Sequence, residues 1–248
     1  MIGGTLPAGV HHADTRTELT DPPLHPGEEE YIALSVDGRR REFTTTRACA
    51  RRALAALGIA SVPILPGVRG APQWPAGVVG SMTHCTGYRA AAVASTADTL
   101  TVGIDAEVNE PLPDGVLEAV SFPHEAAAVH ALGRTQPQVR WDRLLFSAKE
   151  SVYKAWFPLT ERFLTFEDAR ITWDVPGDGR TVTAGRFTAE LLVGGPWPTG
   201  RLLPGRWNLQ DGLLCTSIVL PARLRTPATT PNPTATHTTG PSEDKEYT

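Results

Sequence analysis

Two acidic residues stand two positions apart in VGIDAEV, residues 102–108 of the chain. If this segment is a β-strand, Asp105 and Glu107 lie on one face with Gly103, and their carboxylates are roughly 7 Å apart. An edge strand that turns its polar face to water also accounts for such a pair. In a cleft, the two carboxylates would repel each other and would need a cation. Because no cluster of His or Cys accompanies them, these hard oxygen ligands favour Mg²⁺ over zinc.

A second set of reactive groups lies in WDRLLFSAKESVYKAWF, residues 141–157. Its apolar residues recur at helical spacing and form one stripe. The residues of this stripe are Trp141, Leu144, Leu145, Ala148, Val152, Ala155 and Trp156. Glu150 and Lys154 fall on the opposite side with Arg143. They are either an exposed i,i+4 pair that supports the helix by about 0.3 kcal/mol, or a carboxylate and an ammonium group at a reaction centre.

Groups that bind phosphate are concentrated elsewhere in the chain. GRRR at residues 38–41 begins the densest basic patch, which continues through Arg47 and Arg51. These two arginines are one helical turn apart and could grip a phosphate, although a solvated loop and helix face is the plainer interpretation. His84 ends the segment VGSMTH and is either a hydrogen-bonded, partly buried side chain or a phosphate donor. Neither a Walker loop nor GxGxxG is present, so side chains would have to hold the phosphate.

The composition limits the class of protein. A chain of 248 residues with 41% hydrophobic content can form one large domain or two small ones. The net charge of −4 argues against a general nucleic-acid binder. Cys49, Cys85 and Cys215 are too widely spaced for a disulfide framework or a zinc site. With no signal-peptide pattern and no long apolar run, we expect a cytoplasmic protein without membrane or nucleic-acid partners.

The elements that position these groups follow from periodicity and turn residues. A helix is predicted over residues 44–58, with a threonine as its N-cap and Gly58 at its end. Residues 61–77 are crowded with Pro and Gly and are expected to form a long loop. Further helices are predicted at 115–120, 123–133 and 141–157, and strands at 78–87, 88–95, 99–108, 167–175, 181–193, 205–210 and 212–220.

This order of elements predicts an α+β fold with two similar halves, although no exact internal repeat is visible. Residues 1–108 would form an N-terminal half that contains the basic patch and the first acidic motif. Residues 109–225 would form a C-terminal half around the helix at 141–157. Residues 226–248 are rich in Pro and Thr and poor in bulky apolar residues, so we expect them to be disordered.

Acidic metal ligands, phosphate donors and a Glu/Lys pair together suit the metal-assisted transfer of a phosphorus group. VGIDAE followed later in the chain by FSAKESVYK resembles the paired signature motifs of the 4′-phosphopantetheinyl transferases, of the type that activates surfactin and enterobactin synthetases. The resemblance covers roughly residues 39–175. GRRREFTTTRACARRAL, PQWPAGVVGSMTHCTGYRAAAV and WDRLLFSAKESVYKAWFPLTERFLTFEDARITW are similar to the actinobacterial members in particular.

The resemblance implies a monomer with a pseudo-twofold α+β fold and coenzyme A in the cleft between its halves. It implies Mg²⁺ on the coenzyme A pyrophosphate and transfer of phosphopantetheine to a serine of an apo acyl or peptidyl carrier protein. Adenosine 3′,5′-bisphosphate would be the other product. The implied metal ligands are Asp105, Glu107 and Glu150. Glu150 would also act as the base for the serine, and Lys154 would stabilise charge on the phosphoryl oxygens.

The same resemblance assigns coenzyme A contacts. It places the 3′-phosphate at Arg39 and Arg47, the pyrophosphate at His84 with Thr83 beside it, the reacting phosphate near Lys149 and Lys154, and the pantetheine arm at Leu164, with Asp105 and Glu150 also beside the coenzyme. One position departs from the pattern. Pro66 stands where close relatives often have a lysine, and Arg69 in the same loop is the candidate substitute.

Two other interpretations use the same residues. A Mg²⁺-dependent nuclease or phosphatase would employ the acids on DNA or a phosphate ester, but the net negative charge argues against nucleic acid. A binding protein without catalytic activity would leave Asp105 and Glu107 merely solvated. Coenzyme A binding that depends on these two acids would separate the transferase from both alternatives.

Overall fold

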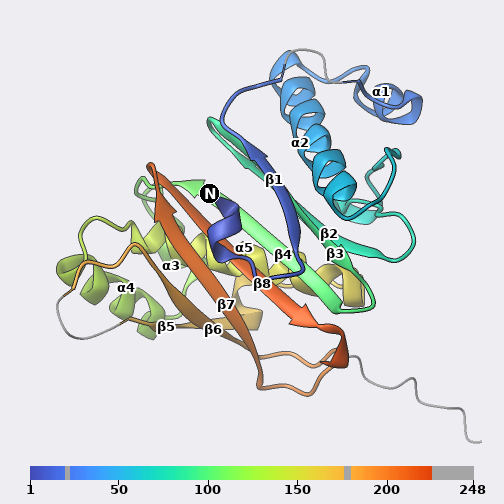
Figure 1. Cartoon of the computed structure of the whole chain (residues 1–248). Helices are drawn as coiled ribbons and strands as arrows, with labels where there is room; N and C mark the ends of the chain where they lie inside the picture. Colours follow the sequence, from blue (N-terminus) through green and yellow to red (C-terminus); the bar gives the residue numbers. More distant parts are fainter. Residues whose placement is uncertain (20–22, 176–179, 225–248) are drawn as a thin grey trace, which may run out of the picture.

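The computed structural model describes residues 1–19, 23–175 and 180–224. Two antiparallel sheets, each with helices packed on it, make up the fold (Figure 1). The predicted α+β class is confirmed. The prediction of a disordered tail concerns residues 226–248, which lie outside the described residues.

The smaller sheet has three strands in the order β1 (His11–Thr15), β3 (Tyr88–Ser95) and β2 (Val78–Cys85). The long helix α2 (Asp37–Ala56) packs against it, and the short helix α1 (Pro26–Ile32) precedes α2 (Figure 1). The central strand β3 is buried along almost its whole length. Its run of alanines allows α2 to approach one face while β4 of the other sheet approaches the other.

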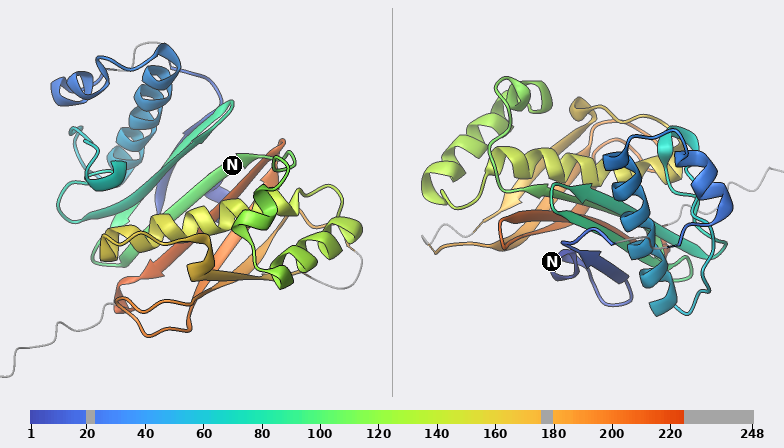
Figure 2. Two further views of the ribbon diagram at one scale, coloured as in Figure 1. Left: turned by 180° about the vertical axis from the view of Figure 1, so that it is seen from behind. Right: turned by 90° about the horizontal axis from the view of Figure 1, so that it is seen from above.

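The larger sheet has five strands, and α5 (Trp141–Thr160) lies along one of its faces (Figure 2). Its strand order is β4 (Thr99–Val108), β8 (Leu213–Pro221), β7 (Arg201–Gln210), β6 (Ala184–Leu191) and β5 (Ala169–Asp174). Two further helices, α3 (Val116–Val120) and α4 (Pro123–Thr135), connect β4 to α5.

The predicted apolar stripe of α5 is confirmed, since all seven of its residues are at most 1% exposed. The stripe packs against aromatic and aliphatic residues of the larger sheet, among them Phe187 and Trp207. Gly103 of β4 permits the close approach of α5, because a Cβ at this position would collide with the Ser151 carbonyl oxygen and the Ala155 amide nitrogen. The helix thereby lies directly over the strand that contains the paired acids.

The alternation predicted for β4 is also confirmed. Val102, Ile104 and Ala106 pack into an apolar cluster with the smaller sheet, while the opposite face turns toward α5. Beside β2, the backbone of β4 bonds to side chains: Ser81 accepts the Ile104 N–H and Thr83 accepts the Ala106 N–H, each at 3.1 Å. The two sheets are therefore joined along β2 and β4 by hydroxyl groups.

One local expectation is wrong, and two elements were not predicted. The helix predicted at 44–58 begins at Asp37, so a threonine is not its N-cap. Thr46 lies inside the helix, where its hydroxyl donates to the Glu42 carbonyl at 2.6 Å and needs no capping role. Neither β1 nor α1 was expected, because HHADT does not alternate and α1 is only seven residues long.

Strand β4 belongs to the larger sheet by its backbone hydrogen bonds. Although β4 was predicted as the last element of the N-terminal half, its ladder partner is β8, near the end of the described chain. The predicted division into residues 1–108 and 109–225 stays a prediction. The pairing means that the first acidic motif is held by strands from both ends of the chain.

Candidate active site

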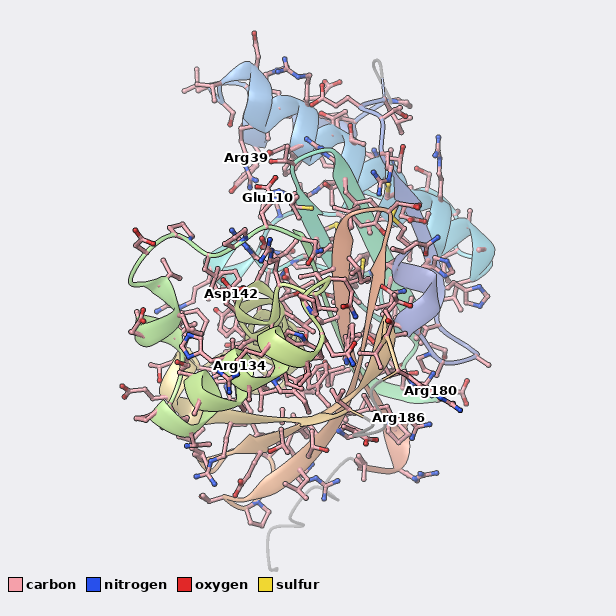
Figure 3. The ribbon with its side chains drawn as sticks, turned by 90° about the vertical axis from the view of Figure 1, so that its left-hand side faces the viewer. Arg39, Glu110, Arg134, Asp142, Arg180 and Arg186 are labelled. Atoms are coloured by element: carbon pink, nitrogen blue, oxygen red, sulfur yellow. The ribbon has the colours of Figure 1, made fainter. Side chains whose placement is uncertain are left out.

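A cleft of about 760 Å³ lies between α2 with the loop around residues 66–74 on one side and β4 with α5 on the other. Figure 3 views the molecule from the side, with Arg39 labelled on α2 and Glu110 labelled just after β4. The cleft gathers most of the residues predicted from sequence. These are Arg39, Arg47, Thr83, His84, Asp105, Glu107, Glu150 and Lys154.

Asp105 is the most deeply buried acid of the cleft, at 4% exposure. Its Oδ1 accepts hydrogen bonds from the Lys154 ammonium at 2.7 Å and from the Thr83 hydroxyl at 3.1 Å. Its Oδ2 is buried and has no hydrogen-bond partner in the described part of the chain. A buried carboxylate oxygen without a partner is costly, so this atom is a strong candidate to bind a ligand.

Glu107 lies one strand pleat further along β4 and has an unusual protonation equilibrium. Burial, followed by the nearby Asp105 charge, raises its pKa to about 7. Arg143 of α5 opposes this shift and donates to Glu107 at 3.2 Å. Asp105 is buried and Glu107 is half-buried, and a divalent cation would stabilise both carboxylates in their ionised form.

Glu150 faces the same cleft from α5. Burial raises its pKa, while the Lys154 ammonium lowers it and Asp105 raises it. Lys154 makes its ion pair with Asp105 rather than with Glu150. The interpretation of Glu150 and Lys154 as an ordinary exposed helix pair therefore does not describe this structure.

On the opposite side, Arg39, Glu42 and His84 form a polar cluster. Arg39 Nη1 is 3.5 Å from His84 Nε2, and the Glu42 carboxylate is 3.9 Å from both side chains. Burial lowers the pKa of His84, and the charges of Arg39 and Lys154 act in the same direction, against that of Glu42. A neutral imidazole at neutral pH can donate one hydrogen bond to a phosphate oxygen.

Arg47 supplies a buried cation to the same region. Its Nε donates to the Ile64 carbonyl at 3.3 Å, and its guanidinium lies over the Phe43 ring, 3.6 Å from the centroid. Burial lowers its pKa to about 10, which still leaves it charged at neutral pH. Phe43 in turn stacks on Tyr31, so an aromatic pair fixes the direction in which this arginine points.

The comparisons with known proteins agree with this site. Residues 27–94 match the profile of the 4′-phosphopantetheinyl transferase N-terminal domain, and residues 101–194 match that of the 4′-phosphopantetheinyl transferase superfamily. The transferase Svp of Streptomyces mobaraensis is 50% identical over 228 residues, which is 90% of each chain. This chain belongs to the 4′-phosphopantetheinyl transferase family.

Two more curated transferases have a similar degree of identity. PptT of Mycobacterium tuberculosis is 49% identical and covers 89% of this chain and 98% of its own, and Npt of Nocardia iowensis is 49% identical over 88% and 99%. The predicted membership is confirmed, including its actinobacterial character. Such agreement over nearly the whole chain excludes the non-catalytic binding protein and argues against the nuclease or phosphatase. No helix in the described ranges is long and apolar enough to span a membrane.

Not every predicted site residue of the transferase reaches the cleft. Lys149 is 3% exposed and donates to the Glu125 carboxylate and to the Phe166 carbonyl, both at 2.8 Å. Leu164 packs in the hydrophobic core of the larger sheet at 6% exposure. The structure therefore does not bring these two residues to the other predicted coenzyme A contacts.

The idea that Arg47 and Arg51 grip one phosphate together is wrong. Arg51 forms an ion pair with Glu28 at 2.9 Å and also donates to the Pro23 carbonyl at 2.8 Å. It does not line the cleft, although i and i+4 share a helix face, because Glu28 and the Pro23 carbonyl hold its guanidinium elsewhere. Of the pair, only Arg47 lines the cleft.

The loop around residues 66–74, in which Pro66 departs from the family pattern, also lines the cleft. Pro66 forms an isolated bridge with Pro72, and the backbone of Arg69 adopts a left-handed conformation with φ 53°. The Arg69 guanidinium lies over the Phe163 ring, 5.2 Å from the centroid, on the far side of the cleft. Arg69 therefore links the two sides in the transferase, and whether it replaces the usual lysine toward phosphate stays a prediction.

Sequence reasoning missed the aromatic lining of the cleft. Tyr31, Phe43, Phe146, Tyr153 and Phe157 all contribute to it. The spacing offers a signal for some of them, since Phe43 precedes Arg47 by one helical turn and Tyr153 precedes Phe157 by one turn. These rings offer apolar surface next to the charged groups, as a long amphipathic substrate requires.

Proposed function

We propose that this transferase moves the 4′-phosphopantetheine group of coenzyme A to a serine of an apo acyl or peptidyl carrier protein. Adenosine 3′,5′-bisphosphate is the second product, and Mg²⁺ is required. One observation supports this most directly: a single cleft gathers Arg39, Arg47 and His84 on one side and Asp105 and Glu150 on the other. Side chains that could bind phosphate therefore lie across the cleft from carboxylates that could hold the metal ion and act as the base.

The acids of the cleft fit a magnesium ion. The partnerless Asp105 Oδ2 and the raised pKa of Glu107 both indicate negative charge that a cation would stabilise. In the described part of the chain, no group of three or more His, Cys, Asp or Glu side chains is gathered closely enough to hold a metal by itself. Magnesium commonly uses one or two carboxylates, with phosphates and water as its other ligands. Asp105 and Glu107 would therefore supply the carboxylates, with Glu150 as the third predicted ligand.

When bound, the ion would neutralise charge on the pyrophosphate of coenzyme A. The protein's own residues perform the remaining tasks. Glu150, whose pKa is raised by burial, is suited to accept the serine proton directly or through a water. Lys154 lies within the same cleft and would stabilise charge on the phosphoryl oxygens, because its bond to Asp105 leaves other ammonium protons available.

The opposite wall would hold the nucleotide end of coenzyme A. Arg39 and Arg47 are the cations available for the 3′-phosphate, and His84 with Thr83 lies closer to the acids, where the pyrophosphate would be. The aromatic residues near α5 would accommodate the pantetheine arm. All of these groups come from a single chain, which supports action as a monomer, and we propose the cytoplasm as its location.

The direct test is incubation of an apo carrier protein with the enzyme, coenzyme A and Mg²⁺, followed by intact mass measurement. The carrier should gain one phosphopantetheine group only when all components are present. Asp105→Ala should abolish the gain while the enzyme stays folded, because the deepest acid of the site is lost. Glu110→Ala is the matched control, since Glu110 follows the same strand and is not among the residues that line the cleft. Absence of transfer to several fatty-acid, polyketide and peptide carriers would reject the proposal.

A further inference from the structure

The helices α1 and α4 begin with the same construction. Each has a proline at the start of its first turn and a glutamate as its third residue, in HPGE and FPHE. Glu28 is 0% and Glu125 is 2% exposed. Each carboxylate accepts the backbone N–H of its own N-cap, His25 at 2.9 Å and Phe122 at 2.8 Å. A buried carboxylate is thus fixed at the start of a helix in each part of the molecule.

Each glutamate then receives a cation from the long helix that follows it. Glu28 accepts two hydrogen bonds from Arg51 of α2 at 2.9 and 3.0 Å. Glu125 accepts one from Lys149 of α5 at 2.8 Å. The cation follows the glutamate by 23 residues in the first case and by 24 in the second.

The resemblance extends to the segment after the long helix. Glu28 accepts the backbone N–H of Ile64 at 2.9 Å, and Glu125 accepts that of Ile171 at 2.6 Å. Each carboxylate therefore ties together a short helix, a long helix and the chain beyond it. We name these sets the first knot (His25, Glu28, Arg51 and Ile64) and the second knot (Phe122, Glu125, Lys149 and Ile171).

Each knot holds a helix that forms one wall of the cleft. In α2, Arg47 lines the cleft one turn before Arg51 of the first knot. In α5, Glu150 lines the cleft and directly follows Lys149 of the second knot. An ion pair that is buried and further hydrogen-bonded opposes rotation or sliding of its helix. Each knot therefore fixes the direction in which the neighbouring cleft residue points.

We propose that Glu28 with Arg51 and Glu125 with Lys149 are two equivalent positioning pairs with different kinetic roles. The first orients the wall that binds the phosphates of coenzyme A. The second orients the wall that performs the reaction, so Lys149 acts through α5 and makes no contact with coenzyme A. This inference rests on the proposed function, from which the two roles of the walls are taken.

The two roles predict a separation of kinetic constants. Loss of the first knot disturbs ground-state binding and should raise KM for coenzyme A with little change in kcat. Loss of the second displaces Glu150 and Lys154 from the reacting atoms and should lower kcat with little change in KM. A displacement of about 1 Å at a reaction centre can cost roughly a hundredfold in rate, so we expect kcat to fall tenfold to a hundredfold.

The experiment compares Arg51→Met with Lys149→Met in the full chain. Both substitutions keep an unbranched side chain and leave a buried glutamate without its cation, so urea unfolding should report a similar loss of stability. Steady-state kinetics with an apo carrier protein supplies kcat and KM, and calorimetry supplies the dissociation constant for coenzyme A. We expect the dissociation constant for coenzyme A to rise roughly tenfold in Arg51→Met and not in Lys149→Met.

Two further sets of variants keep the test decisive. If a single variant does not fold, Glu28→Gln with Arg51→Met and Glu125→Gln with Lys149→Met remove the unpaired charge and retain an acceptor oxygen. These double variants should show the same separation in weaker form. Lys149→Arg preserves the ion pair and should recover most of the lost kcat.

The outcomes are distinct. An increase in KM and in the dissociation constant for Lys149→Met, with kcat preserved, would show that Lys149 contacts coenzyme A and would overturn the inference. The same kinetic change in both variants, or no recovery in Lys149→Arg despite restored stability, would also overturn it. If the wild-type enzyme neither binds coenzyme A nor modifies a carrier, the proposed function itself fails, which is a separate result.

Discussion

The two helices that form the walls of the cleft, α2 and α5, are anchored in the same way but carry different polar side chains. Both α2 and α5 are 20 residues long, and each is tied by a buried glutamate at the start of a shorter helix. The cleft face of α2 offers arginines, whereas that of α5 offers Glu150 with Lys154. Binding a phosphate requires cations alone, but activating a serine requires a base and a cation within one turn. Under the proposed function, one scaffold would serve recognition on one side and chemistry on the other.

The supports behind the walls differ as well. Small and aliphatic residues such as Ala53, Ala91 and Val93 fill the space between α2 and the smaller sheet, whereas Trp141 and Trp156 of α5 pack with Trp207 on the larger sheet. Large aromatic side chains bury more apolar surface and resist displacement more strongly. The wall predicted to carry the reaction therefore has the heavier packing, in keeping with its need for exact placement of Glu150.

The largest effect should come from substitutions in α5, the wall proposed to perform the reaction. We expect Glu150→Gln and Lys154→Ala each to reduce turnover at least about a hundredfold, because a base or a charge stabiliser contributes that much to rate. The melting temperature should change little, since neither side chain belongs to the hydrophobic core. Single-turnover transfer to a carrier protein measures the effect. Near-normal turnover in both variants would return the pair to the status of surface residues.

Substitutions in α2, the wall proposed to bind the phosphates of coenzyme A, should have a smaller and more selective effect on binding. Arg39→Ala and Arg47→Ala should each lose about tenfold or more in affinity for coenzyme A and much less for dephospho-coenzyme A, which lacks the 3′-phosphate. Arg41→Ala is the matched control, because Arg41 lies on the same helix and pairs with Glu18 outside the cleft. Unchanged discrimination between the two ligands would remove the 3′-phosphate from these arginines.

Glu107, on the β4 side of the cleft, predicts a modest pH effect. The pKa of Glu107 is raised to about 7 from its ordinary value of 4.5. A carboxyl group with a raised folded-state pKa stabilises the protein fully below pH 4.5, and this contribution is lost as the pH rises to about 7. Without Mg²⁺, the difference in unfolding free energy between wild type and Glu107→Gln should shift against the wild type over this range. Urea unfolding at pH 5 and 8 measures it, and equal differences at both values would contradict the prediction.

The same equilibrium links Mg²⁺ to protons. Because a cation binds the ionised carboxylate, Mg²⁺ binding should release protons near pH 7 and become tighter as the pH rises. Calorimetry in two buffers of different ionisation enthalpy detects this release. Glu107→Gln should bind Mg²⁺ more weakly and with less proton release.

The smallest effect is expected outside both walls. Residues 226–248 have too few bulky apolar residues to pack on a folded body, so truncation after Arg225 should leave activity and melting temperature nearly unchanged. Thermal unfolding and the carrier assay are sufficient to test this. A fall of several degrees would show that the tail docks on the rest of the chain.

Local pattern was sufficient for much of the fold and for the identity of the acids. The alternation in β4 predicted that Asp105 and Glu107 share a face, and helical spacing predicted which side of α5 is buried. Both are properties of one segment, since the strand and helix periods depend only on neighbouring residues. The short, non-alternating β1 and the early start of α2 carried no such signal.

Only the tertiary structure decided which neighbouring polar groups face the cleft. Lys149 and Glu150 are adjacent, yet Lys149 turns to Glu125 of α4 and Glu150 turns to the cleft. Arg47 and Arg51 are separated in the same way by Glu28 of α1. The polar side of a helix spans several residues of similar type, and spacing within the helix cannot rank them. The buried carboxylates of Glu28 and Glu125, which lie on other helices, determine which of these cations is held away from the cleft, because a buried charge must be paired.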